Sequence, residues 1–426
     1  MDPEPNEDSS FNKIAVIGLG YIGLPTAAMF ASHGINVVGV DVNQPVVDCI
    51  NSGNIHIVEP GLEIVVSDSV AKGNLRASLK IEPADAFLIA VPTPFKGENH
   101  EPDLSYVEAA CKAIASVLQP GNLVVLESTS PVGTTEVMAD WLAEARPDLS
   151  FPQHAGEASD IRIAHCPERV LPGKVMQELI TNDRVIGGMT PVCSEHAATL
   201  YKIFVTAECV IASGPRVAEM AKLTENSFRD VNIAFANELS LICDRLDMDV
   251  WELIRLANRH PRVNILHPGP GVGGHCIAVD PWFIVSSVPD EARLIRTARE
   301  VNDSKPEWVL DKVHAAIGAH LMENPGRTAV DVTIAVYGLA FKPDIDDMRE
   351  SPALLIAKRL ITDHPGPVLV VEPFMSRLPE AMSKARLVSL EESKNASVAV
   401  YLVRHHAFVT APLFDGVVVD ACGIGS

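Results

Sequence analysis

The sequence predicts an α/β protein in which two doubly wound parallel-sheet domains are joined by a helical middle domain with one long helix. Two observations carry this prediction. Short apolar runs alternate with helical periodicity in the first half of the chain and again in its last quarter, which is typical of parallel βαβ units. Between these regions, residues 217–246 contain neither Pro nor Gly and repeat apolar side chains at helical spacing.

The first domain is expected over residues 13–210, because strand-like and helical runs alternate there without a break. The predicted strands are 13–17, 36–41, 86–92, 122–129, 161–167 and 183–188. Helical stretches are predicted between them, at 24–34, 104–118 and 134–145.

A central helical domain is expected over 211–310 and a C-terminal α/β domain over 311–426. Besides the long helix, the central domain has helical stretches at 250–258 and 293–302. The predicted C-terminal strands are 333–341, 367–373, 397–403 and 416–421. Residues 1–12 are acidic and polar and lack the basic and apolar regions of a signal peptide, so we expect a disordered tail there.

Composition and charge limit the possible partners. The net charge of −21 argues against nucleic acid or an anionic membrane as the main partner. An anionic ligand would need local basic residues, and the candidates are Lys222, Arg259, Arg262, Lys342 and Arg349. The eight cysteines form no C-x-x-C pair and no cluster with zinc spacing, which indicates thiols in a reducing cytoplasm and no metal site.

A glycine-rich turn follows the first predicted strand and opens a helix, with the spacing Gly18-x-Gly20-x-x-Gly23. Such a turn lets the backbone approach a diphosphate at a helix N-terminus, as in Rossmann-like domains. Asp41 ends the second strand, where a carboxylate binds the ribose hydroxyls of NAD and disfavours the 2′-phosphate of NADP. The predicted dinucleotide contacts of this region are Gly18, Gly20, Tyr21, Ile22, Gly23 and Asp41.

A second glycine-rich segment, 268–276, ends in Cys276. So many glycines suggest close approach of the backbone to a ligand, and a cysteine beside such a loop can be an exposed nucleophile. The alternative is a buried structural thiol, which is what we expect of the other seven cysteines. Asp280, four residues later, either holds a water or a catalytic lysine, or caps the helix that follows Pro281.

Polar residues at two further places are candidates for chemistry. Lys222 and Asn226 are four residues apart on the long helix and so lie on one face, although a helical lysine is more often a solvated charge. Glu168 follows a strand of the first domain, at the edge where parallel sheets bind ligands; the alternative is a surface salt bridge with Arg169. Thr93 and Thr129 end strands at the same edge and can bond a cofactor or water.

Taken together, these segments resemble the UDP-glucose/GDP-mannose dehydrogenase family from about residue 13 to residue 423. The resemblance rests on long stretches at 165–174, 218–244, 258–285 and 338–353. UDP-glucose dehydrogenases usually carry a GFGGSC-like loop followed by Lys-Asp, whereas this loop reads GVGGHCIAVDP, which favours the branch that acts on acetamido sugars. Arg404 and the final DACGIGS depart from the family pattern, and both lie in the C-terminal domain.

The resemblance implies roles for the candidate residues. Cys276 matches the catalytic cysteine, Lys222 and Asn226 the residues that stabilise oxyanions, Asp280 the carboxylate that orients water or lysine, and Glu168 the residue implicated in thioester hydrolysis. The implied cofactor is NAD, with Thr93, Thr129 and Arg349 added to the contacts of the first glycine turn. The implied substrate contacts are Arg169, Val170, Leu171, Lys222, Asn226, Arg259, Arg262, Gly273, Phe341 and Lys342.

The implied reaction is a four-electron oxidation of the C6 alcohol of UDP-N-acetyl-D-mannosamine to a carboxylate, through a cysteine thiohemiacetal and thioester. The same chemistry on UDP-N-acetylglucosamine or UDP-glucose is an alternative, because motifs do not reveal the sugar pocket. Two other classes are a two-electron β-hydroxyacid-type dehydrogenase and an inactive nucleotide-sugar-binding regulator. Cys276 and the third domain argue against the first, and the intact catalytic set argues against the second. We expect a homodimer through the long helix, possibly a higher oligomer.

Overall fold

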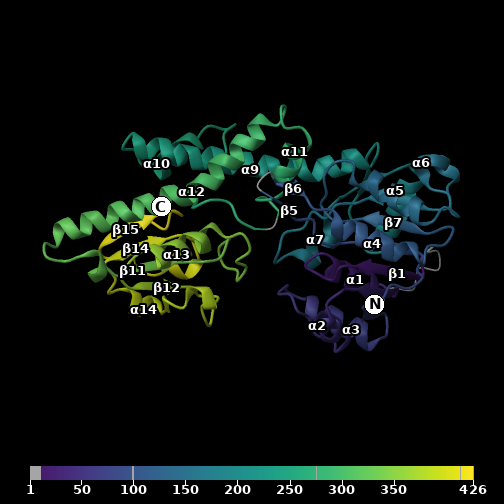
Figure 1. The fold of residues 1–426 in the computed structure, drawn as a ribbon, viewed down its shortest axis with the longest axis horizontal. Coiled ribbons are helices and arrows are strands. Elements are labelled where there is room, and N and C mark those ends of the chain that lie inside the picture. The colour runs from purple at the N-terminus through teal and green to yellow at the C-terminus, as the bar shows by residue number, and fades with distance from the viewer. Residues whose placement is uncertain (1–10, 98–99, 275, 413, 426) are drawn as a thin grey trace. The chain divides into compact units, whose positions relative to one another are not determined.

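The computed structural model describes residues 11–97, 100–274, 276–412 and 414–425 (Figure 1). Up to residue 10, the predicted tail lies outside the described residues. The chain divides into two compact units, which we call the N-terminal unit (Met1–Glu225 with Trp282–Ser287) and the C-terminal unit (Asn226–Pro281 with Val288–Ser426).

The N-terminal unit is built on an eight-stranded sheet with the order β10-β9-β8-β7-β4-β1-β2-β3. Read from β3 to β8, the strands follow the 3-2-1-4-5-6 order of a dinucleotide-binding domain, and every neighbouring pair in this stretch is parallel. The strands are β1 (Lys13–Ile17), β2 (Asn36–Val40), β3 (Leu75–Ser78), β4 (Ala86–Ile89), β7 (Leu123–Leu126), β8 (Arg162–His165), β9 (Arg184–Gly188) and β10 (Cys209–Ile211). A separate antiparallel hairpin joins β5 (Phe95–Lys96) and β6 (Glu101–Pro102).

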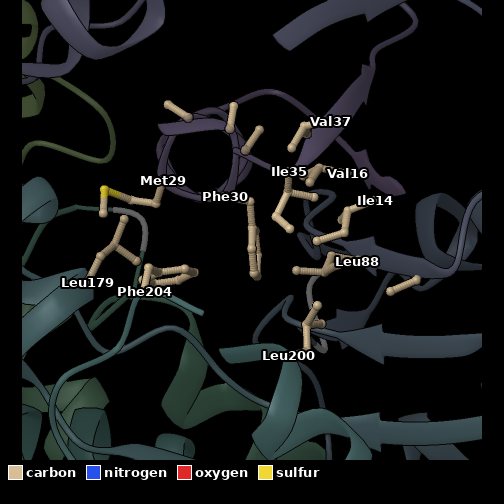
Figure 2. Close-up of a cluster of buried hydrophobic side chains, with 14 of the residues drawn as sticks. Ile14, Val16, Met29, Phe30, Ile35, Val37, Leu88, Leu179, Leu200 and Phe204 are labelled. Carbon is tan, nitrogen blue, oxygen red and sulfur yellow. The ribbon is translucent and has the colours of Figure 1, made fainter. Parts of the chain in front are cut away.

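Both faces of this sheet are buried, as a doubly wound fold requires. Ile14 and Val16 of β1 belong to one hydrophobic cluster, and Ala15 and Ile17 to the other. Figure 2 shows the first cluster, in which Phe30 faces the strand side chains. The covering helices are α1 (Gly23–Ser32), α2 (Gln44–Asn51), α3 (Leu62–Ala71), α7 (Val175–Thr181) and α8 (Pro191–Tyr201) on this face, with α4 (Ser105–Ala115) and α5 (Thr134–Ala145) on the other; α6 (Pro152–Ala155) is a single turn.

The predicted doubly wound α/β fold is confirmed, with one antiparallel pairing between neighbouring strands of this sheet. β9 pairs antiparallel with β8, and β10 runs parallel to β9. After β8 the chain enters the short helix α7, whose Leu179 packs into the same cluster as α1. The chain therefore re-enters the sheet from the end at which it left, and strands joined in that way run in opposite directions.

The C-terminal unit contains a five-stranded parallel sheet with the order β13-β12-β11-β14-β15. Its strands are β11 (Ile334–Tyr337), β12 (Val368–Val371), β13 (Arg386–Leu387), β14 (Val398–Tyr401) and β15 (Val417–Asp420). Side chains again alternate between two buried clusters, because Ile334 and Val336 belong to one and Ala335 and Tyr337 to the other. The shorter helices are α10 (Val250–Ala257), α13 (Pro352–Asp363), α14 (Leu390–Ser393) and α15 (His406–Val409), and α11 (Asp280–Ser287) begins in this unit.

Two helices of 31 residues stand out in Figure 1, α9 (Pro215–Arg245) and α12 (Arg293–Glu323). The first confirms the predicted long helix. The second is longer than predicted because it continues through Pro306, where a helix usually ends. Its buried side chains, among them Val309 and Val313, pack into the core of the C-terminal sheet, and this burial outweighs the lost backbone hydrogen bond. No helix in the described part of the chain is long and apolar enough to cross a membrane.

Candidate active site

The first glycine turn is closely packed on its protein side and open at its centre. Gly18 has a φ of 90°, and a Cβ atom there would lie 2.5 Å from the Ala90 carbonyl oxygen. A Cβ on Gly23 would lie 1.8 Å from the Gly18 carbonyl oxygen. At Gly20, by contrast, no described atom comes within 4 Å of a Cβ position. Only glycine fits the two outer positions, and the middle one leaves room for a ligand against the backbone.

Asp41 follows β2 beside this turn. Its carboxylate accepts hydrogen bonds from the Leu19 N–H at 3.0 Å and from the Asn43 N–H at 2.9 Å. Helix α1 begins at Gly23 with no acidic residue in its first turn, so its N-terminal dipole favours an anion. Tyr21 and Ile22 lie between the turn and the helix. These features fit a dinucleotide, with the diphosphate at the turn and a ribose at Asp41.

The structure brings Thr93 and Thr129 together at the carboxyl edge of the sheet. The Thr93 hydroxyl, which is buried, donates to the Thr129 carbonyl oxygen at 2.5 Å. The two residues follow β4 and β7, which are neighbours in the sheet. Both therefore lie at the edge where a dinucleotide binds in this strand order.

Glu168 is buried in an ion pair, and its partner is not the predicted one. Its Oε2 lies 2.9 Å from Nη1 of Arg184, and both side chains are almost fully buried. Its Oε1 accepts from the Arg169 backbone N–H at 2.6 Å. The alternative of a surface salt bridge with Arg169 is therefore wrong. The Arg169 guanidinium pairs instead with Glu225 of α9 at 2.6 Å, which joins this loop to the helix that carries Lys222.

The loop after Glu168 is held by carboxylates that accept its backbone N–H groups. Leu171 donates to Glu178 at 2.8 Å. Gly173 and Val175 donate to the buried Glu59, at 2.9 and 2.8 Å. Val170 packs against the hydrophobic core while the Leu171 side chain is exposed. The predicted substrate contacts at 169–171 thus lie on an ordered loop.

A second buried carboxyl group shares the surroundings of Glu168. Glu127 accepts a hydrogen bond from the Tyr201 hydroxyl at 2.6 Å, and the Arg184 guanidinium lies over the Tyr201 ring. Burial, with a contribution from the nearby Glu168 charge, raises the pKa of Glu127 to about 7. Two carboxyl groups therefore lie close to the positive charge of Arg184.

Helix α9 carries Lys222, Asn226 and a buried anchor. Lys222 and Asn226 are both half-buried and lie one turn apart on the continuous helix. The anchor is Glu219, which accepts from the backbone N–H groups of Gly133 and Thr135 at 2.6 and 2.8 Å and so caps the N-terminus of α5. Burial raises the pKa of Glu219.

Cys276 differs from the other cysteines of the chain. Its side chain is exposed, whereas the other seven are buried or half-buried, and no disulfide joins any of the eight, all of which are described. Burial raises the pKa of Cys111 and of Cys166 to about 12, so these thiols stay protonated.

Asp280 stands one helical turn after Cys276. Its backbone N–H donates to the Cys276 carbonyl oxygen at 2.8 Å, and its buried carboxylate accepts from the Asn226 side-chain amide. The structure therefore brings Asn226, Asp280 and the Cys276 backbone together. Asp280 is also the first residue of α11.

A pocket of about 470 Å³ lies in the C-terminal unit, and the predicted Gly273, Phe341 and Lys342 line it. A Cβ on Gly273 would lie 2.8 Å from the Phe341 Cβ, so glycine permits this close approach. Arg229 and Arg404 add positive charge to its lining. The pocket therefore combines apolar walls with cations, which suits an anionic ligand with an apolar part.

Three predicted arginines lie apart from this pocket. Arg259 and Arg262 are exposed in the turn that follows α10 and are absent from its lining. Arg349 is exposed, and its guanidinium binds the Asp347 carboxylate at 2.6 Å. Its carbonyl oxygen accepts from the Gly274 N–H at 3.1 Å, which ties it to the cysteine loop.

Sequence reasoning missed several residues of these arrangements. Arg184 lies 16 residues from Glu168, and no local pattern links the two. Glu59 is 114 residues from the loop that it holds. Arg229 had a signal, because it lies one turn after Asn226 on α9. Arg404 was noted as a departure from the family pattern and not as a lining residue.

Family models match three successive parts of the chain. Residues 12–205 match the NAD binding domain of the UDP-glucose/GDP-mannose dehydrogenase family, 216–304 its central domain and 335–424 its UDP binding domain. The glycine turn with Asp41 lies in the first match, and the lining residues Phe341 and Lys342 lie in the third.

Individual proteins are similar over nearly the whole chain. A UDP-N-acetyl-D-mannosamine dehydrogenase from Yersinia pestis is 65% identical over 403 residues, covering 94% of this chain and 95% of that protein. An NDP-N-acetyl-D-galactosaminuronic acid dehydrogenase from Ralstonia nicotianae is 59% identical over 423 residues, covering 98% and 97%. The solved UDP-D-ManNAc dehydrogenase from Pyrococcus horikoshii superimposes with a TM-score of 0.85 at 37% identity, covering 97% and 96%. The chain belongs to the UDP-glucose/GDP-mannose dehydrogenase family, and its cofactor is NAD.

Proposed function

We propose that the chain oxidises the C6 alcohol of UDP-N-acetyl-D-mannosamine to a carboxylate in two oxidations, and that Cys276 is the covalent nucleophile of the second. The observation that carries this proposal is Cys276 itself, an exposed thiol on a glycine loop, one turn before the buried Asp280. When bound, NAD supplies the hydride acceptor for both oxidations.

In the first half of the reaction, Lys222 and a water take the proton of the C6 hydroxyl as the alcohol becomes an aldehyde. The Cys276 thiolate then forms a carbon–sulfur bond with the aldehyde carbon and gives a thiohemiacetal. The amide of Asn226 and the ammonium of Lys222 stabilise its oxyanion. The hydrogen bond between Asn226 and Asp280 supports this role, because it fixes the amide beside the residue that follows the nucleophile by one turn.

In the second half, the thiohemiacetal carbon loses its hydride and becomes a thioester. Water then attacks the thioester carbon, the carbon–sulfur bond breaks, and Cys276 leaves as a thiolate. Asp280 or Glu168 accepts the proton of the water.

The choice of sugar rests on similarity. The relative from Yersinia pestis is named for UDP-N-acetyl-D-mannosamine, and the solved structure from Pyrococcus horikoshii is named for the same sugar. The relative from Ralstonia nicotianae is named for a galactosaminuronic acid at only slightly lower identity. The alternatives to test are therefore UDP-N-acetylglucosamine, UDP-glucose and the galacto epimer. The cations Lys342, Arg229 and Arg404 suit the diphosphate of any of them.

We also propose a homodimer in which α9 packs against a second copy of the chain. Phe228, Phe235 and Ile242 recur at seven-residue spacing on this helix, and their side chains are 68%, 51% and 46% exposed. Such spacing gives one apolar stripe along a helix, which a second copy of the same stripe can bury. Replacing Phe235 by Glu should shift the molecular mass in light scattering from dimer to monomer; an unchanged mass would contradict the proposed interface.

The test of the proposed reaction is to count NADH per sugar consumed, with each of the four nucleotide sugars at matched concentration. The proposal predicts about two NADH and a uronic acid from UDP-N-acetyl-D-mannosamine. Preferred turnover of another sugar would keep the chemistry and replace the substrate. One NADH per sugar would indicate a two-electron dehydrogenase, and binding without turnover of any sugar would favour a nucleotide-sugar-binding regulator.

A further inference from the structure

The glycine-rich loop that begins at residue 268 is attached through the backbone N–H groups of its first and last glycines. At its far end the Gly274 N–H donates to the Arg349 carbonyl oxygen. At its near end the Gly269 N–H donates to the side-chain Oδ1 of Asn237, on α9, at 2.8 Å. Pro268 and Pro270 flank Gly269 and have no N–H to donate, so Gly269 is the position at which the loop's entry can be held in this way.

Asn237 is the first member of a buried chain of hydrogen bonds. Its Nδ2 donates to Oδ1 of Asn302, on α12, at 2.8 Å. Asn302 in turn donates from its Nδ2 to Asp230 at 2.8 Å, and Arg299 donates to the same Asp230 oxygen at 2.7 Å. The four side chains are almost wholly buried, with exposed fractions of 1% or less. We call Asp230, Asn237, Asn302 and Arg299 the amide relay.

From Gly269 through the two amides, the donors all point the same way, towards the carboxylate of Asp230. Each amide accepts from the member nearer the loop and donates to the member nearer Asp230. Hydrogen bonds arranged in such a series polarise one another, and the ionic pair of Asp230 with Arg299 fixes the far end. Each amide therefore has one favoured orientation, because flipping either of them would set donor against donor or acceptor against acceptor.

The same elements limit where the loop can lie. A Cβ on Gly271 would lie 3.0 Å from Pro352 and 3.3 Å from the Asn302 carbonyl oxygen. A Cβ on Gly273 would lie 2.5 Å from the Glu350 carbonyl oxygen. The glycines thus let the backbone lie against α12 and the start of α13, while the relay holds its entry.

We propose that Asn237 and Asn302 are positioning residues that fix the Cys276 loop for capture of the aldehyde, a role that rests on the proposed function. Neither residue needs to touch the substrate. The first oxidation yields an aldehyde without a bond to sulfur, whereas the second requires that Cys276 reach the aldehyde carbon before the aldehyde departs. A misplacement of about 1 Å in such a step can cost about 100-fold in rate. The relay therefore acts on the second oxidation and not on the first.

The test compares the two oxidations in Asn237→Ala and in wild-type protein. The first is followed with the alcohol substrate in the presence of an aldehyde trap, and the second with supplied aldehyde. We expect the second oxidation to fall about 10- to 100-fold and the first to fall less than about three-fold, with trapped aldehyde appearing in place of acid. Equal loss in both steps would show a general structural defect and overturn the proposal.

Two further comparisons keep the test sharp if Asn237→Ala folds poorly. Gly269→Pro removes the N–H that the relay binds, and Gly269→Ala keeps it at a position where a Cβ meets no described atom closer than 3.8 Å. The relay predicts more released aldehyde from the proline variant than from the alanine variant. Asn232→Ala is the matched amide control, because the Asn232 side chain bonds a carbonyl of its own helix and should release no more aldehyde than wild type. Equal release from the two Gly269 variants would contradict the proposal.

Hydrogen exchange separates this proposal from the proposed function. If wild-type protein forms one NADH per sugar, the covalent route fails. The positioning role of the relay can then still be tested by the hydrogen-exchange rate of the Gly269 backbone amide. This amide should exchange at least about 10-fold faster in Asn237→Ala than in wild type. Unchanged exchange would show that the relay does not hold the loop.

Discussion

In each of the two large sheets, a carboxylate holds the turn that follows the first strand, but the surroundings of the two carboxylates differ. In the N-terminal unit, the Gly18 N–H donates to the Val40 carbonyl oxygen, and the Leu19 N–H donates to the carboxylate of Asp41. In the C-terminal unit, the Gly338 N–H donates to the Val371 carbonyl oxygen, and the Leu339 N–H donates to the carboxylate of Glu372 at 2.7 Å. Each acidic residue directly follows the second strand of its sheet, β2 or β12, and locks the turn that follows the first, β1 or β11.

The difference lies in what else reaches the two carboxylates. Asp41 is half-buried, and its bonds to Leu19 and Asn43 leave acceptor capacity towards solvent. Glu372 is buried, with Nε2 of His405 3.3 Å from its Oε2 and a further bond from the Phe374 N–H. The carboxylate that holds the turn is therefore accessible to a ribose in the N-terminal unit and enclosed by protein in the C-terminal unit. A carboxylate after a strand indicates a nucleotide site only where its second oxygen remains accessible.

The largest expected effects come from the glycines at the two turns. Gly18→Ala places a Cβ 2.5 Å from a backbone oxygen, at a φ of 90°, in the turn that we expect to bind NAD. We expect the KM for NAD to rise at least about 100-fold, or ~2.8 kcal/mol, because the turn must open. Steady-state kinetics with varied NAD checks this, and a KM close to that of wild type would remove the turn from the cofactor site.

Gly338→Ala is the corresponding change in the turn after β11, which the buried Glu372 holds. A Cβ there would lie 2.4 Å from the Val403 Cβ, at a φ of 91°. We expect the free energy of unfolding of the C-terminal unit to fall by about 2–4 kcal/mol, from backbone strain and overpacking. Denaturant unfolding measures the change. A raised KM for NAD without lost stability would contradict the assignment of a structural role.

The two carboxylates should separate binding from stability. Asp41→Asn removes the charge that a ribose hydroxyl would bind, so we expect the KM for NAD to rise about 10- to 100-fold. Glu372→Gln should leave that KM within about two-fold and lower the free energy of unfolding by about 1–3 kcal/mol. Kinetics and unfolding of both variants check the pair. Equal changes in the KM for NAD and in the free energy of unfolding in the two variants would contradict the different roles that we assign to Asp41 and Glu372.

Two buried carboxyl groups, one in each unit, should contribute to the pH dependence of stability with opposite signs. Burial alone would raise the pKa of Glu372, but hydrogen bonds from His405 and the Leu339 N–H hold it below the ordinary value of 4.5. Its stabilisation is therefore present above pH 4.5 and lost as the pH falls through the lowered pKa. Burial raises the pKa of Glu127 to about 7, so its contribution is full below pH 4.5 and lost as the pH rises through 7.

Unfolding measured between pH 3 and 8 in Glu127→Gln and Glu372→Gln tests these signs. The first variant should lose the decline in stability between about pH 4.5 and 7, and the second should lose the acid-side decline. Tyr201 can still donate to the glutamine in the first variant, so the hydrogen bond at that position is kept. An unchanged pH profile in either variant would show that the carboxyl group is not the source.

The comparison also shows what the sequence can and cannot predict. Gly18, Gly20, Gly23 and Asp41 were predictable because turn, helix and acidic residue lie within one local pattern. The hydrogen bond between Glu372 and the Leu339 N–H was not predictable, because no such glycine pattern follows β11. The direction of β9 was missed, since side-chain periodicity is the same for parallel and antiparallel strands. The length of α12 was not predicted, because a proline such as Pro306 usually ends a helix. The tertiary packing that keeps α12 helical beyond Pro306 cannot be inferred from the local sequence.

Within the candidate site, residue types were more predictable than their partners. Lys222, Asn226, Cys276 and Asp280 stand out by spacing and by composition. The pairing of Glu168 with Arg184 depends on the antiparallel direction of β9, which the sequence did not indicate. Likewise, the bond from Asn226 to Asp280 joins positions 54 residues apart. Long-range pairs of this kind are set by how elements pack, and a single sequence carries no signal for them.

In the proposed reaction, Cys276 acts in the second oxidation and is dispensable for the first. The most direct measurement is the number of NADH formed per UDP-N-acetyl-D-mannosamine consumed by Cys276→Ala, with the aldehyde trapped as it forms. We expect the ratio to fall from about two in wild type to about one, with trapped aldehyde in place of the uronic acid. Two NADH and a uronic acid from the alanine variant would contradict the covalent route.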